Sequence, residues 1–220
     1  MAKKRKVNNL MALAVLGVVI MRPMHRYEIA TMLKAFGKDR DMGVKWGSLY
    51  TVVDNLRKAG FLEIVGSERA GARPERTIYQ ITEAGRAELF DWTREVLAEP
   101  EPEQLRFVAG LSLLSTIPPD DVIDLLGSRI EALRRTIEAE TAEIDQLLRD
   151  DLPRLFIVEN QYRIAMLEAE ANWAEALRKE LVDGSFPGVD QWRQFHVDGL
   201  PPPGMVEQAE RSFAAERDSS

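Results

Sequence analysis

Five side chains with hydrogen-bonding groups recur within one short segment near the start of the chain. They are Ser48, Tyr50, Thr51, Asn55 and Lys58. Hydroxyl, amide and ammonium groups of this kind can hydrogen-bond to base edges and to phosphate oxygens. On one face of a helix they would carry out recognition through reversible hydrogen bonds and ion pairs.

Apolar residues at helical spacing predict the element that positions these groups. They are Leu49, Val52, Val53 and Leu56. At 3.6 residues per turn they fall within about 100° of arc, so they would face a core. Gly60 stands where a glycine commonly ends a helix. We therefore expect residues 46–58 to lie on a helix with one buried and one polar side.

Two short strands joined by a basic turn are predicted after this helix. Residues 61–65 and 77–81 are rich in β-branched and aromatic side chains, and Thr82 suits the start of another helix. Arginines on such a turn suit phosphates or a narrow minor groove. The basic residues assigned to DNA contact here and before the helix are Lys45, Arg69, Arg73 and Arg76. This order of elements predicts a winged helix-turn-helix that binds double-stranded DNA.

Five motifs in the first ninety residues together resemble the PadR family of transcriptional regulators. They are Val15-Leu-Gly17, Pro23-Met-His-Arg-Tyr-Glu-Ile29, Gly47-Ser-Leu-Tyr50, Leu56-Arg-Lys-Ala-Gly60 and Thr82-Glu-Ala-Gly-Arg86. The resemblance implies a winged-helix DNA-binding domain in a regulator that is more commonly a repressor than an activator. One position departs from the pattern, because the family commonly has glycine where this chain has Arg26. That departure bears on the pose of the second helix.

Charge divides at the same place as the motifs. Residues 1–86 hold sixteen Lys or Arg against eight Asp or Glu, whereas residues 87–220 hold thirteen against twenty-eight. Nucleic acid responds to the local field, so a chain with a net charge of −7 can still present a basic face. The chain has no cysteine, which excludes disulfides and thiolate metal sites and fits a cytoplasmic protein.

The first twenty residues imitate a secretory signal. A basic run over 3–6 precedes an apolar run over 10–21, but residues 21–25 offer no small-residue cleavage site. Twelve apolar residues are also too few to span a bilayer, which needs about twenty. We expect a buried central helix, no membrane partner, and a basic arm that either contacts phosphates or stays solvated.

The second half of the chain has the spacing of paired helices. Apolar residues alternate at four- and three-residue steps from 123 to 147, as in a coiled coil, and a second stripe follows over 155–181. The segment Glu170-Ala-Asn-Trp-Ala-Glu-Ala-Leu177 resembles the C-terminal helices of the PadR branch that includes virulence-gene activators, and the resemblance implies a homodimer. The residues assigned to dimerisation are Ile123, Leu126, Ile130, Leu133, Ile137, Ile144, Leu147 and Trp173.

Aromatic and methionine side chains could also line a pocket for a small aromatic or hydrophobic effector. The candidates are Phe90, Trp92, Tyr162 and Met166. Such residues at helical spacing are more often core or dimer contacts. From Asp183 onward glycines and prolines predict a less ordered tail, in which Phe186, Trp192 and Phe195 could hold the segment to the dimer surface.

These patterns together predict a mainly helical protein with a small two-stranded wing. We expect a DNA-binding domain over 1–98, a helical dimerisation domain over 99–182 and a tail over 183–220. Catalysis is disfavoured, since the two histidines lie in unrelated segments and no nucleophile or phosphate-loop motif is present, and we expect no cofactor or metal. The alternative to a DNA-binding regulator is a winged-helix module that binds protein.

Overall fold

Helices dominate the computed structural model, which describes residues 5–38, 46–68, 76–100 and 106–199. The chain divides into two compact units, Met1–Glu103 and Gln104–Ser220. None of the described helices is both long and apolar enough to span a membrane.

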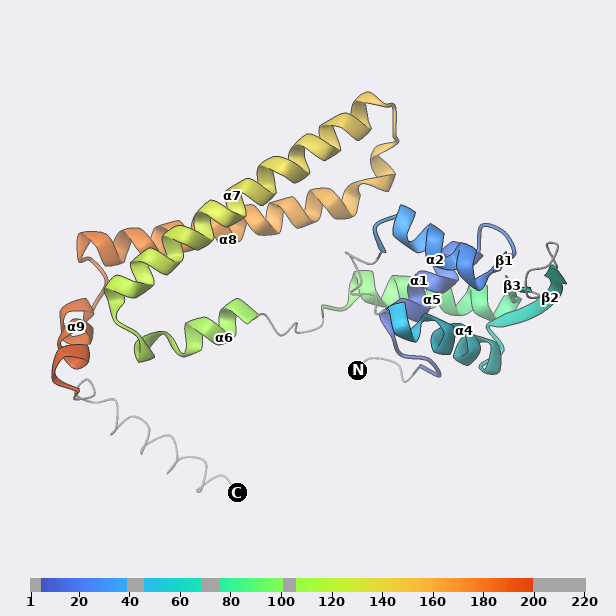
Figure 1. Ribbon diagram of the computed structural model, residues 1–220, viewed down its shortest axis with the longest axis horizontal. Coiled ribbons are helices and arrows are strands. Elements are labelled where there is room, and N and C mark those ends of the chain that lie inside the picture. The colour runs from blue at the N-terminus through green and yellow to red at the C-terminus, as the bar shows by residue number, and fades with distance from the viewer. Residues whose placement is uncertain (1–4, 39–45, 69–75, 101–105, 200–220) are drawn as a thin grey trace, which may run out of the picture. The chain divides into compact units, whose positions relative to one another are not determined.

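The first unit is a group of helices with a small sheet at one side. Its elements are α1 (Leu10–Val19), β1 (Met24–His25), α2 (Arg26–Ala35), a 3-10 turn (Trp46–Ser48), α4 (Leu49–Lys58), β2 (Leu62–Glu68), β3 (Arg76–Ile81) and α5 (Glu83–Ala98). Helix α1 contacts α2, α4, α5 and β3, so it is the central element of the unit (Figure 1). This arrangement confirms the predicted winged helix-turn-helix.

Helix α1 is central because almost every side of it is apolar. All of its residues except Leu10 and Gly17 are buried, and Leu16 is fully enclosed. A helix that is hydrophobic all round must be covered all round. The side chain of Asn9 accepts a hydrogen bond from the Met11 backbone N–H and so caps the start of the helix. The predicted buried central helix is confirmed.

The sheet has three antiparallel strands in the order β1-β3-β2, one more than the predicted hairpin. Strands β2 and β3 form the wing, with a bulge between Ile64 and Gly66. The short β1 pairs with β3 and thereby ties the start of α2 to the wing. Gly85, in the first turn of α5, lies so near β2 that a Cβ there would collide with the Phe61 carbonyl oxygen. That close approach requires glycine.

The second unit is built on a long helical hairpin. Its elements are α6 (Arg106–Ser112), a 3-10 turn (Leu114–Thr116), α7 (Pro119–Arg149), a 3-10 turn (Arg154–Phe156), α8 (Val158–Asp183) and α9 (Val189–Asp198). Helices α7 and α8 run side by side in opposite directions (Figure 1). Proline and two carboxylates begin α7 as predicted, since the N-terminal turn lacks N–H partners and favours negative charge.

Helix α9 lies in the segment that was expected to be less ordered. Gly184 and Gly188 have positive φ values and end one helix and begin the next, so they turn the chain. Trp192 is buried and its indole N–H donates to the Ile117 carbonyl at 3.0 Å. The expectation was therefore wrong for residues 189–198, whose aromatic side chains hold them to the start of α7.

Candidate nucleic-acid interface

Helix α4 has the two faces that the sequence predicts. Its four apolar residues, Leu49, Val52, Val53 and Leu56, are buried, and the exposed side carries Tyr50, Thr51, Asn55 and Lys58. Ser48 is half-buried, and its hydroxyl lies 3.9 Å from the sulfur of Met11. The structure therefore places four of the predicted recognition residues on the exposed face of α4 and the fifth, Ser48, in the 3-10 turn directly before it.

Asp54 lies in the middle of this exposed face. Its carboxylate pairs with Lys58 at 2.8 Å and with Arg57 at 3.1 Å. Hydrogen bonds from these two cations hold the pKa of the Asp54 carboxyl below its ordinary value. An ionised acceptor is repelled by phosphates but can accept from the amino group of a cytosine edge. Asp54 thus gives the face a group that favours base edges over the backbone.

Arg26 borders α4 on the Tyr50 side. Its guanidinium lies 5.4 Å from the ring centre of Tyr50 and 5.3 Å from that of Tyr79 in β3. The residue starts α2 in ordinary helical geometry after the cap at His25, so the departure from glycine leaves the helix start regular. Arg26 instead links α2, α4 and the wing, because a guanidinium between two aromatic faces is attracted to both.

The cap of α2 is a reciprocal pair of hydrogen bonds. The Glu28 backbone N–H donates to His25 Nδ1, and the Glu28 carboxylate accepts from the His25 backbone N–H at 3.0 Å. Burial alone would raise the pKa of Glu28, but the bonds from His25 and from Arg22 outweigh it and hold that pKa below its ordinary value. This box fixes the junction between β1 and α2.

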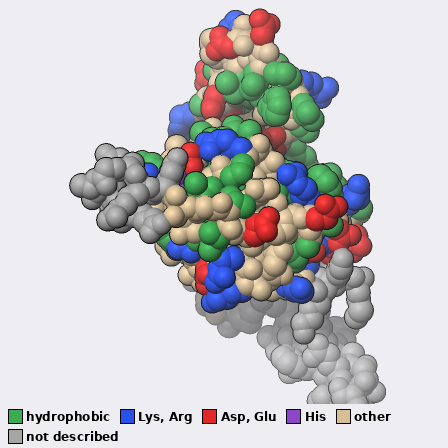
Figure 2. Space-filling view, turned by 90° about the vertical axis from the view of Figure 1, so that its right-hand side faces the viewer, with side chains coloured by type: hydrophobic (Ala, Val, Ile, Leu, Met, Phe, Trp, Pro, Cys, Tyr) green, Lys and Arg blue, Asp and Glu red, His purple; other side chains and the backbone are tan. Residues whose placement is uncertain are grey.

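The wing residues are partly described. Arg76 is half-buried at the start of β3, 3.4 Å from His25 Nε2 and 5.9 Å from the ring centre of Tyr27. Lys45, Arg69 and Arg73 lie outside the described residues. On the end of the first unit that Figure 2 presents, Lys and Arg side chains occupy several separate places. A surface of this kind can meet more than one stretch of a phosphate backbone.

Arg5 has a structural role that its position in the basic run did not suggest. Its side chain is 1% exposed and pairs with Glu88, Asp91 and Glu95 on α5, and its guanidinium lies 5.1 Å from the ring centre of Trp92. Burial would lower the pKa of Arg5, but Glu88 and Glu95 outweigh this and raise it. The expectation of an arm that contacts phosphates or stays solvated is therefore wrong for Arg5. The sequence feature that could have indicated this role is the spacing of the three carboxylates, which places them along one face of α5.

The effector candidates lie in both units. Trp92 is buried in the core of the first unit, while Phe90 on the same helix is half exposed. Tyr162 and Met166 are exposed on α8 of the second unit. A pocket formed by these four residues stays a prediction.

The dimerisation candidates are covered to different degrees within the single chain. Leu126, Ile130 and Ile144 are buried, and the other four on α7 are half-buried. Trp173 on α8 is 49% exposed and meets Phe107 edge-on, with ring centres 5.9 Å apart. Within the described residues no cluster of His, Asp or Glu could hold a metal ion.

Comparison with known proteins agrees with this geometry. Residues 15–91 match the model of the transcriptional regulator PadR-like family, whose members are regulators and not enzymes. Comparison with curated proteins found no match.

Solved structures share the fold over most of the chain. Bacillus subtilis PadR in complex with operator DNA is 17% identical, with a TM-score of 0.66 over 79% of this chain and 99% of that one. The same protein in complex with p-coumaric acid has a TM-score of 0.64, at 17% identity and the same coverage. The Vibrio cholerae virulence activator AphA is 20% identical, with a TM-score of 0.58 over 79% of this chain and 98% of that one. Residues 15–91 therefore match the PadR-like family of transcriptional regulators, and the chain shares the fold of PadR and AphA over 79% of its length.

Proposed function

We propose that the chain is a homodimeric transcriptional repressor that binds a pseudo-palindromic operator in double-stranded DNA. The observation that carries this proposal is the exposed polar face of α4, opposite a face that closes the core of its unit. Residues 46–58 would enter the major groove, which is wide enough to admit a helix. Arg69, Arg73 and Arg76 would contact the backbone or the minor groove. The operator complex of Bacillus subtilis PadR, which has the same fold, supports this reading.

The homodimer is supported by a stripe of exposed apolar residues on α8. Val158, Tyr162, Met166 and Trp173 are each about half exposed or more, and their spacing places them on one face of the helix. An exposed apolar stripe of this kind is typical of an association site. We expect a second copy of the chain to cover this stripe, because a dimer places two recognition helices about 34–36 Å apart, where they can read two half-sites. The division of the chain into a DNA-binding domain (1–98), a dimerisation domain (99–182) and a tail (183–220) is part of this proposal. Residues 99–182 would form the dimer contact.

An effector is proposed on chemical grounds. Bacillus subtilis PadR has been solved with p-coumaric acid, a small aromatic acid. A ligand that binds one arrangement of a dimer better than another shifts operator affinity by that difference in binding. We propose an aromatic or hydrophobic effector for this chain, and Phe90, Trp92, Tyr162 and Met166 stay candidates for its pocket. Acting on DNA, such a regulator would work in the cytoplasm.

The deciding experiment measures binding to a fluorescent duplex from the promoter of the protein's own gene. It is titrated at two salt concentrations beside a scrambled duplex. We expect preferential binding of the promoter at one dimer per site, with affinity that falls steeply as salt rises, since each neutralised phosphate releases counterions. Absence of binding to either duplex at low salt would contradict the proposal and favour a protein-binding winged helix.

Variants on α4 test the assigned face. Tyr50→Ala removes both the phenol and the ring that faces Arg26, whereas Tyr50→Phe removes only the hydroxyl. We expect Tyr50→Ala to weaken binding of the promoter about tenfold or more, and Tyr50→Phe to weaken it less. Lys179→Ala, on the exposed surface of α8, is the control and should bind as the unmodified protein does. Equal affinity for all four proteins would remove Tyr50 from the interface.

A further inference from the structure

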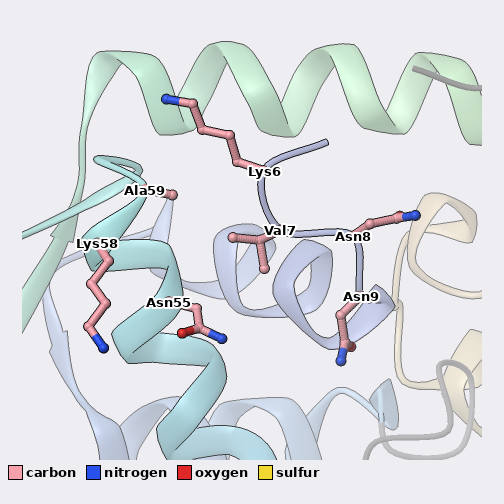
Figure 3. Close-up of a pocket in the computed structure, with 7 residues that line it drawn as sticks. All are labelled: Lys6, Val7, Asn8, Asn9, Asn55, Lys58 and Ala59. Carbon is pink, nitrogen blue, oxygen red and sulfur yellow. The ribbon is translucent and has the colours of Figure 1, made fainter. Parts of the chain in front are cut away.

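A hollow borders α4 on the flank opposite Arg26. It has a volume of about 580 Å³ and lies between the N-terminal segment and the last turns of the helix. Its lining residues are Lys6, Val7, Asn8, Asn9, Asn55, Lys58 and Ala59. Figure 3 shows Val7 between the two sides of the hollow and Asn55 directed toward the N-terminal segment. Two of the lining residues, Asn55 and Lys58, also belong to the exposed face of α4.

The lining suits an anion. It contains two ammonium groups and three side-chain amides, and no carboxylate lines it. The Lys6 ammonium lies 5.7 Å from the ring centre of Phe61, and the Lys58 ammonium pairs with Asp54 at 2.8 Å. Both lysines keep long, exposed side chains that can turn to a ligand. Ammonium and amide N–H groups are the donors that phosphate oxygens accept from in protein–DNA interfaces.

The N-terminal side of the hollow is held at both of its ends. Arg5 is fixed by three carboxylates on α5, and the side chain of Asn9 caps α1. Only three residues, 6–8, join these two anchors. A short segment fixed at each end loses little further conformational freedom when a ligand binds, so its contacts contribute more of their energy to affinity. Arg5 and Asn9 therefore act as positioning residues for Lys6 and Asn8.

We propose that this hollow binds a phosphate of the sugar–phosphate backbone of double-stranded DNA, an inference that rests on the proposed function. A helix in the major groove has a backbone strand on each side. The Tyr50 side of α4 adjoins Arg26 and the wing, and the Asn55 side adjoins the hollow. The N-terminal segment is then a third DNA-contacting element beside α4 and the wing, and it contributes affinity without reading sequence.

Lys6→Ala and Asn8→Ala test the hollow by the salt dependence of binding. A lysine at a phosphate contributes about one unit to the slope of log affinity against log salt concentration. We expect Lys6→Ala to lower that slope by about one and to weaken the promoter and scrambled duplexes by the same factor. Asn8→Ala should weaken both duplexes equally with little change in slope, because it carries no charge. Lys179→Ala is the matched control for loss of an exposed lysine.

The outcomes separate this inference from the proposed function. If Tyr50→Ala loses promoter binding while Lys6→Ala keeps the slope and affinity of the unmodified protein, the hollow does not bind a phosphate. The proposed DNA-binding function would then still stand. Unmodified protein that binds no duplex would overturn both. Inorganic phosphate, titrated while the Asn8 and Asn55 side-chain amides are followed by NMR, distinguishes the source of the anion. Saturation by free phosphate that leaves duplex affinity unchanged would also overturn the proposal.

Discussion

The two units bury their apolar residues to different extents. In the first unit a single helix, α1, is enclosed on nearly all sides by three helices and a strand. In the second unit the paired helices α7 and α8 enclose a smaller set, and large apolar side chains such as Tyr162 and Trp173 stay exposed. One chain therefore completes the core of the first unit, whereas α8 keeps an apolar face that a second copy can cover. With the proposed homodimer, the stability of the first unit should depend on its own packing, and the stability of the second unit on protein concentration.

The largest expected effect comes from the centre of the first unit. Leu16 is fully buried, so Leu16→Ala leaves a cavity and should lower the free energy of unfolding by about 2–5 kcal/mol. Leu125→Ala, on the exposed side of α7, is the matched truncation and should cost less than about 1 kcal/mol. Denaturant unfolding followed by circular dichroism measures both. Similar losses would break the contrast between an enclosed and an open unit.

The next effect addresses the exposed face of α8. Met166→Glu places a charge in the proposed dimer contact, and an unpaired charge buried there should weaken association roughly 100-fold or more. The helix itself should remain folded, since Met166 is exposed in the single chain. Analytical ultracentrifugation over a range of concentrations gives the dissociation constant. Unchanged self-association would place the dimer contact elsewhere.

Removing Arg5 tests the polar part of the first unit. Arg5→Ala leaves three carboxylates on one face of α5 without their shared cation and should destabilise the unit by about 2 kcal/mol. This figure lies below that for a fully buried pair because Asp91 is half exposed. Arg5→Met keeps much of the packing on Trp92 and separates the loss of charge from the loss of contact. Thermal unfolding at low and high salt measures both variants. Stability equal to that of the unmodified protein would mean that the ion pairs of Arg5 make no net contribution to folding.

A smaller effect is expected where Arg26 links α2 to the recognition helix. Each guanidinium–ring contact is worth about 0.5–1 kcal/mol, so Arg26→Gly should weaken promoter binding roughly tenfold through the orientation of Tyr50. Arg26→Lys keeps the charge without the planar group. Its affinity for the promoter should lie between those of the unmodified protein and Arg26→Gly. Fluorescence anisotropy with the promoter duplex ranks the three proteins. Tight binding by Arg26→Gly would mean that the core alone orients α4.

The smallest effect is the pH dependence of the α2 cap. The pKa of Glu28 is lower in the folded protein than its ordinary value. Its stabilisation is therefore complete above the ordinary pKa of about 4.3 and is lost as pH falls through the lower, folded value. Glu28→Gln should cost about 1 kcal/mol at pH 7 and nothing once the carboxyl is protonated. Unfolding measured from pH 7 to pH 3 checks this, and a constant difference between the two proteins would contradict it.

Helical periodicity predicted α4 and the α7–α8 pair, a continuous apolar run predicted α1, and β-branched and aromatic residues on either side of a basic turn predicted the wing. Strand β1 was missed because two residues are too few to show an alternating pattern. Only their pairing with β3 makes them a strand. Arg5 was missed because its partners lie more than eighty residues away. Helix α9 was missed because Gly184 and Gly188 were taken to prevent order, whereas their positive φ values allow the turn that brings Trp192 into the core.

The enclosure of α1 also sets the order in which the first unit can fold. Helix α1 leaves the ribosome before α5, which covers one side of it and follows more than sixty residues later. Contacts between such distant parts of a chain form slowly, because the loop between them must close first. During synthesis the side of α1 that α5 covers therefore stays exposed until α5 emerges. Association with other chains or with a chaperone is most favoured in that interval. We expect synthesis that stalls before residue 92 to release an aggregation-prone fragment.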